Sequence, residues 1–249
     1  MRQHTAMKKH IFGLSLLLLI SACTMPVSAP AAESTPTQTP LSAPTTVRAA
    51  PSLVPTETAV PTPEPLPLYF TDEFDTSSPY WEFLQAAGNS APQIIYDGNL
   101  RINFPSADTW FVGVHNAHTY ANVFVNAKMS ISPNGSVGLI CRYSESGWYE
   151  FNAANGAYSI LFGQWLSPGV AKYIPIVTAQ SNLLAGGGSH DLGLFCEDDF
   201  VHTFVNDTPL RRIEVTNYRL TEGNVGIAAA SFVEVPAEAL FENFSVKEK

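Results

Sequence analysis

The chain has 249 residues, and 22 Asp and Glu against 13 Lys and Arg give it a formal net charge of −9. This balance argues against nucleic acid as a partner, where a basic footprint is expected, and against electrostatic docking on anionic lipid. Charged residues make up only 14% of the chain and aromatic residues 11%. That composition suits an all-β extracytoplasmic domain with an aromatic-bearing surface.

The N-terminal segment has the layout of a secretory signal. Lys8 and Lys9 form a charged n-region, and residues 11–20 form a short apolar h-region that small residues close before Cys23. The closing letters ISAC resemble the lipobox of bacterial lipoproteins, in which the cysteine is lipidated and becomes the first mature residue. The resemblance implies a signal peptide over residues 1–22, lipidation at Cys23, and a protein tethered by acyl chains to the extracytoplasmic side of a membrane. A plain secretory signal is the alternative, whereas a transmembrane helix needs about 20 apolar residues.

A proline-rich tract follows the cysteine. Residues 24–67 hold 11 of the 19 prolines, mixed with Ala, Thr and Ser. Such a segment buries too little apolar surface to offset its ordering entropy. We therefore expect residues 23–67 to be the lipidated cysteine and a disordered linker.

From residue 68 the sequence consists of short runs of β-branched and aromatic residues that are separated by clusters of Gly, Asn, Asp and Pro. In residues 123–132, alternate positions are apolar, the period of a half-buried strand. The Asn155-Gly156 and Asn206-Asp207 pairs indicate tight hairpin turns. The longest helical candidate, 80–87, is too short to be convincing. We expect strands at 99–104, 123–132, 136–143, 148–153, 158–162, 191–197, 201–205, 212–216, 225–231 and 240–247. Residues 68–249 are thus predicted to form an all-β, two-sheet antiparallel sandwich or jelly roll.

Two cysteines remain once Cys23 is assigned to lipid. Cys141 and Cys196 both lie in apolar strand-like runs, and two thiols in an exported protein favour a disulfide. Two buried free thiols are the alternative. Neither cysteine has the close Cys/His spacing of a zinc site.

Several phrases between residues 70 and 247 are similar to those of one known superfamily of β-sandwich domains. FTDEFDTSSPYW is similar to the first strand of these domains, and SVGLICRYSESGWYEFN with GAYSILF is similar to their central hairpin. HDLGLFCEDDFVHTFVNDTPL follows their strand-turn-strand pattern, with Asp207 in place of the usual glycine. GNVGIAAASF and ALFENFSV resemble the closing strands. Together these phrases resemble the concanavalin A-like lectin/glucanase superfamily, which includes laminin G-like domains and the 3-keto-disaccharide hydrolase group. The resemblance implies a two-sheet jelly roll that hosts lectins, enzymes or adhesion modules.

Motifs for catalysis are weak. The Glu-x-Asp-x-x-Glu run of the superfamily's glucanases does not occur in the sequence, and neither does a Gly-x-Ser-x-Gly elbow. Glu150, on a strand beside Trp148, is a weak candidate for a general acid or a sugar acceptor. No cofactor is expected, except that the resemblance allows Ca²⁺, with Asp72 and Asp75 as weak candidate ligands.

Carbohydrate binding has better support, because sugar sites combine aromatic faces with planar polar groups. Tyr173 and the glycine-rich loop at 179–189 belong to the wider set of candidates. We therefore expect non-catalytic binding of a glycan or cell-surface polysaccharide. The alternatives are a glycoside-cleaving enzyme of the 3-keto-disaccharide hydrolase type and an adhesion or protein-interaction module. The candidate binding residues are Trp110, Arg142, Trp148, Tyr149, Asn152 and Trp165.

Overall fold

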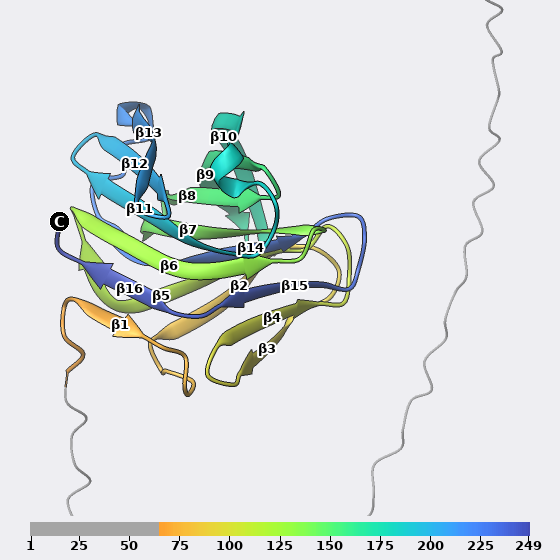
Figure 1. The fold of residues 1–249 in the computed structure, drawn as a ribbon. Helices are drawn as coiled ribbons and strands as arrows, with labels where there is room; N and C mark the ends of the chain where they lie inside the picture. The colour runs from red at the N-terminus through yellow and green to blue at the C-terminus, as the bar shows by residue number, and fades with distance from the viewer. Residues whose placement is uncertain (1–64) are drawn as a thin grey trace, which may run out of the picture. The chain divides into compact units, whose positions relative to one another are not determined.

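The computed structural model describes residues 65–249, which form two facing antiparallel β-sheets (Figure 1). The predicted all-β sandwich is confirmed. The predicted signal peptide, Cys23 and nearly all of the predicted linker lie outside the described residues. Across residues 65–249, no helix has the length and apolar character that crossing a membrane requires.

The nine-stranded sheet has the order β13-β12-β11-β6-β15-β4-β3, with β16 pairing both β6 and β1. Its strands are β1 (Phe70–Asp72), β3 (Gln93–Tyr96), β4 (Leu100–Phe104), β6 (Val123–Ile131), β11 (Ser189–Glu197), β12 (Phe200–Val205), β13 (Thr208–Glu214), β15 (Ala237–Phe241) and β16 (Phe244–Lys247).

The seven-stranded sheet has the order β10-β9-β8-β7-β14-β5-β2. Its strands are β2 (Trp81–Ala87), β5 (Trp110–Tyr120), β7 (Gly135–Ser144), β8 (Gly147–Ala154), β9 (Ala157–Ser167), β10 (Val170–Gln180) and β14 (Gly223–Ser231). Two short 3₁₀ turns, η1 (Asn182–Leu184) and η2 (Thr216–Tyr218), complete the described elements.

The main core fills the space between the sheets. Strand β6 contributes Val123, Val125, Ala127 and Met129, each at most 1% exposed, and these are residues that the period-two pattern placed on one face. The Asn206-Asp207 hairpin is also confirmed. Both residues have positive φ, 50° and 60°, which a tight turn between twisted strands requires, and they join β12 to β13.

Four strands were not predicted: β2, β3, β5 and β10. Residues 80–87, the weak helical candidate, contain β2, which pairs with β5. The predicted strand 240–247 is two strands, β15 and β16, and both pair with β6. The break occurs at the junction, where the backbone N–H of Lys128 donates to the Asn243 side chain and its carbonyl accepts from the Glu242 N–H.

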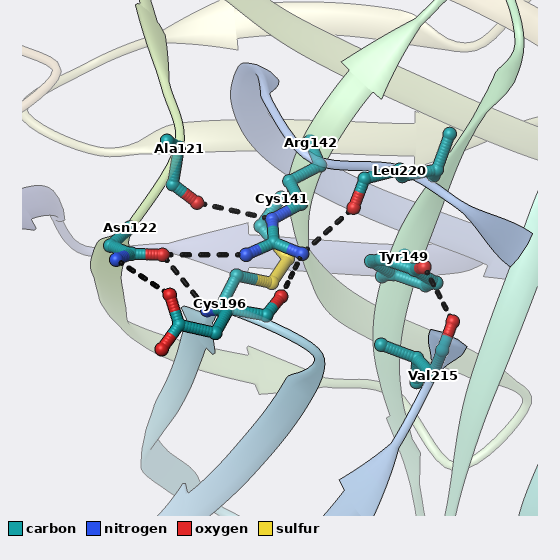
Figure 2. Close-up of a disulfide and its surroundings, with 9 residues drawn as sticks. Ala121, Asn122, Cys141, Arg142, Tyr149, Cys196, Val215 and Leu220 are labelled. Carbon is teal, nitrogen blue, oxygen red and sulfur yellow. Dashed lines mark hydrogen bonds between the residues drawn. A yellow bond between two sulfur atoms is a disulfide. The ribbon is translucent and has the colours of Figure 1, made fainter.

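A disulfide joins the two sheets. Cys141 on β7 is bonded to Cys196 on β11, with their Cα atoms 6.5 Å apart (Figure 2). The predicted pairing is therefore confirmed. The cysteines are 55 residues apart in sequence. Because β7 and β11 belong to different sheets, the bond fixes one strand of each sheet against the other.

The seven-stranded sheet curls strongly. Strands β10 and β5 are five places apart in its order, which corresponds to about 24 Å along a flat sheet. Yet the rings of Tyr173 on β10 and Trp110 on β5 have centroids 4.5 Å apart, and β10 contacts β2 at the opposite edge. The face turned away from the main core, which we call the concave face, is therefore closed over by its own sheet. It encloses a second apolar cluster built on Ala86, Val112, Val114, Ile140, Trp148 and Ala228.

Candidate functional site

Strand β8 is buried on both faces because it separates the two clusters. Tyr149 and Phe151 belong to the main core. By the strand's period of two, Trp148, Glu150 and Asn152 point into the concave face. Trp148 and Glu150 are fully buried, and Asn152 is 8% exposed. The concave face thus has a polar row inside an otherwise apolar interior.

Glu150 is the unusual member of this row. Its Oε2 accepts a hydrogen bond from Trp148 Nε1 at 3.2 Å, and its Oε1 accepts one from Asn152 Nδ2 at 2.9 Å. Burial raises the pKa of Glu150 from 4.5 to about 7, and the two hydrogen bonds oppose that rise. Near neutral pH this carboxyl group therefore exchanges between its acid and carboxylate forms.

Aromatic side chains pack around Trp148. Its ring centroid lies 5.3 Å from that of Trp165, 5.5 Å from that of Tyr143 and 5.7 Å from that of Tyr173. Trp165 Nε1 donates to Tyr143 Oη at 2.8 Å. Gly163 faces Trp148 across the β8–β9 ladder, and a side chain there would overlap the indole. Tyr143, Trp148 and Trp165 thus form one closed end of the concave face.

The other end opens to solvent through a pocket of about 290 Å³, which we call the mouth pocket. Trp110 and Tyr173 lie on its wall with their ring planes 39° apart. Phe232, 36% exposed, lies at its rim. The Phe232 backbone is fixed on both sides, since its N–H donates to Asn134 O at 2.8 Å and its carbonyl accepts from Asp108 N at 3.1 Å. The full lining is Trp110, Asn152, Ala154, Ala157, Tyr158, Ser159, Leu161, Tyr173, Pro175 and Phe232.

Two polar residues, Asn152 and Tyr173, belong to the lining of the mouth pocket. The Asn152 side chain lines the pocket and donates to the buried Glu150, so the carboxyl group holds the amide in place. Tyr173 also lines the pocket, and within residues 65–249 its buried Oη has no hydrogen-bond partner. Burial, together with the nearby Glu150 and Tyr143, raises the pKa of Tyr173 well above 10. The phenol therefore stays protonated near neutral pH.

The concave face brings together most of the candidate binding residues. Trp110 and Asn152 line the mouth pocket, whereas Trp148 and Trp165 lie behind it in the closed end. Tyr149 is elsewhere: it is fully buried in the main core, where its Oη donates to Val215 O at 3.1 Å (Figure 2). The structure thus gives Tyr149 a contact on the opposite side of β8 from the pocket.

Arg142 also lies away from the pocket, next to the disulfide (Figure 2). It is 1% exposed and sits at a bulge in β7 with a φ of 54°. Its guanidinium donates to the carbonyl oxygens of Ala121 at 3.1 Å, Asp198 at 2.6 Å and Leu220 at 2.8 Å. Burial lowers the pKa of Arg142, and nearby acidic groups oppose this. The contacts of this side chain tie three loops together.

The candidate calcium ligands, Asp72 and Asp75, line one pocket of the described domain. Asp72 Oδ1 accepts from the Phe74 N–H at 2.9 Å, and Oδ2 accepts from Trp81 Nε1 at 2.8 Å. Both carboxylate oxygens are thus engaged by the protein. Asp75 lines the same shallow pocket as Asp72, but the described residues contain no group of three or more His, Cys, Asp or Glu side chains able to hold a metal. Binding of Ca²⁺ at Asp72 and Asp75 stays a prediction.

A second carboxylate for glycoside hydrolysis is also missing from the pocket. None of the described residues that line the mouth pocket is Asp or Glu. Glu82 stands in the same cross-strand row as Glu150. Glu82 is exposed on the edge strand β2 and is not among the residues that line the mouth pocket.

Ser159 and Phe232 were missed as pocket residues. Ser159 belongs to β9, opposite Asn152 in the ladder, and Phe232 follows β14. The one sequence signal for Phe232 is an aromatic residue directly after an apolar strand. Because aromatic residues are common in and beside strands, this signal does not single out a pocket residue.

The sequence matches no family model and no curated protein. Solved structures are similar in fold. A β-glucanase from Bacillus licheniformis is 11% identical over 73% of this chain and 98% of its own, with a TM-score of 0.53. A Bacteroides ovatus GH16 protein from a mixed-linkage glucan locus, in complex with its G4G4G3G product, is 8% identical over 72% and 99%, with a TM-score of 0.53. The carbohydrate-binding module CBM66 from Bacillus subtilis is 14% identical over 68% and 96%, with a TM-score of 0.49. The likeness to the first two of these structures shows that the described domain has the concanavalin A-like jelly-roll fold.

Proposed function

We propose that the domain binds carbohydrate without cleaving it, at the mouth pocket of the curled sheet. The observation that carries this proposal is the combination of the Trp110–Tyr173 ring pair with an amide, Asn152, that a buried carboxyl group holds at the same pocket. Aromatic surface with a few fixed polar groups is the usual composition of a small-molecule site.

The chemistry of the pocket suits a sugar. The rings of Trp110, Tyr173 and Phe232 offer apolar faces to the C–H groups of a pyranose. The Asn152 amide offers hydrogen bonds to its hydroxyl groups. Two solved structures of the same fold are a β-glucanase and a GH16 protein holding a glucan product, which makes soluble β-glucans the first ligands to test.

Hydrolysis is less well supported than binding. Glu150 has the raised pKa of a general acid, but it is fully buried beneath Trp148 and Asn152. A two-carboxylate mechanism also needs a partner across the scissile bond, and no acidic residue of the described domain lines the pocket.

Binding is tested by isothermal titration calorimetry of the purified protein against soluble glucans, xylans and galactans, with product analysis of the same samples. Trp110→Ala and Phe232→Ala are each expected to weaken binding about tenfold or more, as truncation of a central aromatic contact does. Val233→Ala is the matched control, because Val233 is 81% exposed beside Phe232 and does not line the pocket. Trp148→Ala is unsuitable, because removing a fully buried Trp costs about 3–5 kcal/mol of stability.

Three outcomes distinguish the functions. Saturable binding without product, weakened by Trp110→Ala, supports the proposal. Release of reducing or keto-sugars supports the glycoside-cleaving alternative. If no polysaccharide binds and a protein partner is recovered instead, the domain is an interaction module and the proposal is wrong.

We also propose that the domain is displayed on the extracytoplasmic side of a membrane through lipid on Cys23. The Cys141–Cys196 disulfide supports an oxidising compartment, and the lipobox-like ISAC supports the anchor. Labelling with radioactive palmitate should mark the wild-type protein. Cys23→Ser should lose the label and leave the membrane fraction. A labelled Cys23→Ser protein would contradict this assignment.

A further inference from the structure

We infer that the mouth pocket takes the terminal unit of a glycan chain rather than an internal stretch. This inference rests on the proposed carbohydrate binding and deepens it. It follows from how the curled sheet closes the concave face on the sides and at one end, so that a chain has a single way in.

The sides of the concave face are closed by the sheet itself. A polysaccharide lying across an open concave sheet would enter over one edge strand and leave over the other. Here the edge strands β10 and β2 contact each other. The Tyr173 ring of β10 reaches to 4.5 Å from that of Trp110 on β5. A chain crossing the strands would have to separate this aromatic pair.

The inner end is closed by side chains. Beyond Tyr173 lies Trp148, which is fully buried. Trp165 covers Trp148 and is fixed by its 2.8 Å hydrogen bond to Tyr143 Oη. A ligand entering at the mouth therefore meets packed aromatic rings and cannot continue through the sheet.

The size of the pocket agrees with a single bound unit. Its volume of about 290 Å³ lies just below the range usual for ligand pockets, which is about 300–1,000 Å³. Asn152, 8% exposed, is the more buried part of the lining, whereas Phe232, 36% exposed, is at the rim. A terminal sugar can thus donate and accept inside, while the next unit packs on Phe232 and leads out to solvent.

The test counts binding sites per mass of polysaccharide. The polysaccharide that binds in the calorimetric panel is partly hydrolysed with acid, its chain ends are quantified, and binding capacity is measured at equal mass before and after cutting. For a chain-end site, the moles of protein bound per gram should rise in proportion to the chain ends created. For a site that binds internal stretches, capacity per gram should stay constant or fall.

Oligosaccharides from the same hydrolysate provide a second measurement. If only the terminal unit and its neighbour contact the protein, affinity should stop rising beyond the disaccharide or trisaccharide. An affinity that keeps rising with each added unit would overturn the inference, because it requires an extended cleft.

The failure of the inference is distinct from that of the proposed function. Binding whose capacity per gram does not respond to cutting overturns the chain-end inference and leaves carbohydrate binding intact. Absence of binding by the whole panel overturns both. The Phe232→Ala variant should lose affinity for the disaccharide more than for the monosaccharide; an equal loss for both would contradict the placing of the second unit on Phe232.

Discussion

Replacing Glu150 by glutamine should remove a pH dependence from the stability of the domain. The carboxyl group is fully buried, and its pKa is raised from 4.5 to about 7. Because the folded protein holds this proton more tightly than the unfolded chain does, the contribution of Glu150 to stability is fully present below pH 4.5. It is lost as the pH rises through about 7.

The size of the effect follows from the pKa. One pKa unit corresponds to about 1.4 kcal/mol, so the rise to about 7 corresponds to about 3 kcal/mol of unfolding free energy lost between pH 4 and pH 8. Glutamine has no charge to bury in this range. Its carbonyl oxygen can accept from Trp148 Nε1, and its amide can donate to Asn152 once that side chain is turned over.

The assay is urea denaturation of both proteins, with the disulfide intact, at a series of pH values. The measured quantity is the difference in unfolding free energy between wild type and Glu150→Gln, because groups that titrate equally in both cancel. This difference should fall by about 3 kcal/mol from low to high pH. Glu145→Gln, at an exposed residue of the adjoining turn, is the control and should leave the wild-type profile unchanged.

A difference that does not vary with pH would refute the reasoning. It would mean that Glu150 is solvated or paired with a cation in the folded protein, and the description of the concave face as a closed interior would then be wrong. A difference that rises with pH would mean that the carboxylate form is the stabilised one.

Three further substitutions test the packing. Arg142→Ala should cost about 3–5 kcal/mol in urea denaturation, because it removes a guanidinium that donates to three carbonyl groups; a cost below 1 kcal/mol would contradict the role described. Gly163→Ala should cost about 1–3 kcal/mol, since the new methyl group overlaps the Trp148 indole, and an unchanged midpoint would show that Trp148 can move. Replacing Cys141 and Cys196 together by serine should cost about 4 kcal/mol for a 55-residue separation. An equal stability of the reduced and oxidised wild type would contradict it.

The strands that could be predicted are those with a clear local pattern. Strand β6 alternates apolar and polar residues because one face meets the core and the other meets solvent. Strand β10 was missed because it is an edge strand with Pro175 inside it and only partial burial. The segment of β2 was a weak helical candidate because its apolar residues do not alternate strictly with polar ones. Its extended conformation depends on pairing with β5.

The site could be predicted only in part, for a different reason. Trp110, Trp148, Trp165 and Asn152 were selected by residue type, and the structure does place them on one face. The closeness of Trp110 to Tyr173 depends on the curl of seven strands, which no local pattern records. Tyr149 and Arg142 have the right residue types but point to the main core and to the loops beside the disulfide. The alternation of side chains along β8 turns Tyr149 away from the concave face, and a bulge in β7 turns Arg142 toward the loops. Composition shows neither feature.

Strand β8 also explains why likeness of fold is a weak guide to chemistry in this domain. In an open sheet, a Glu on the concave face would meet solvent and substrate directly. Here the curl turns that face into a second apolar cluster, so Glu150 is enclosed and its two oxygens accept from the protein's own Trp148 and Asn152. A carboxyl group buried in this way can still orient the Asn152 amide, which lines the mouth pocket. The position of a carboxyl group in a shared fold therefore does not by itself indicate catalysis, because the curl of the sheet decides whether the group meets solvent.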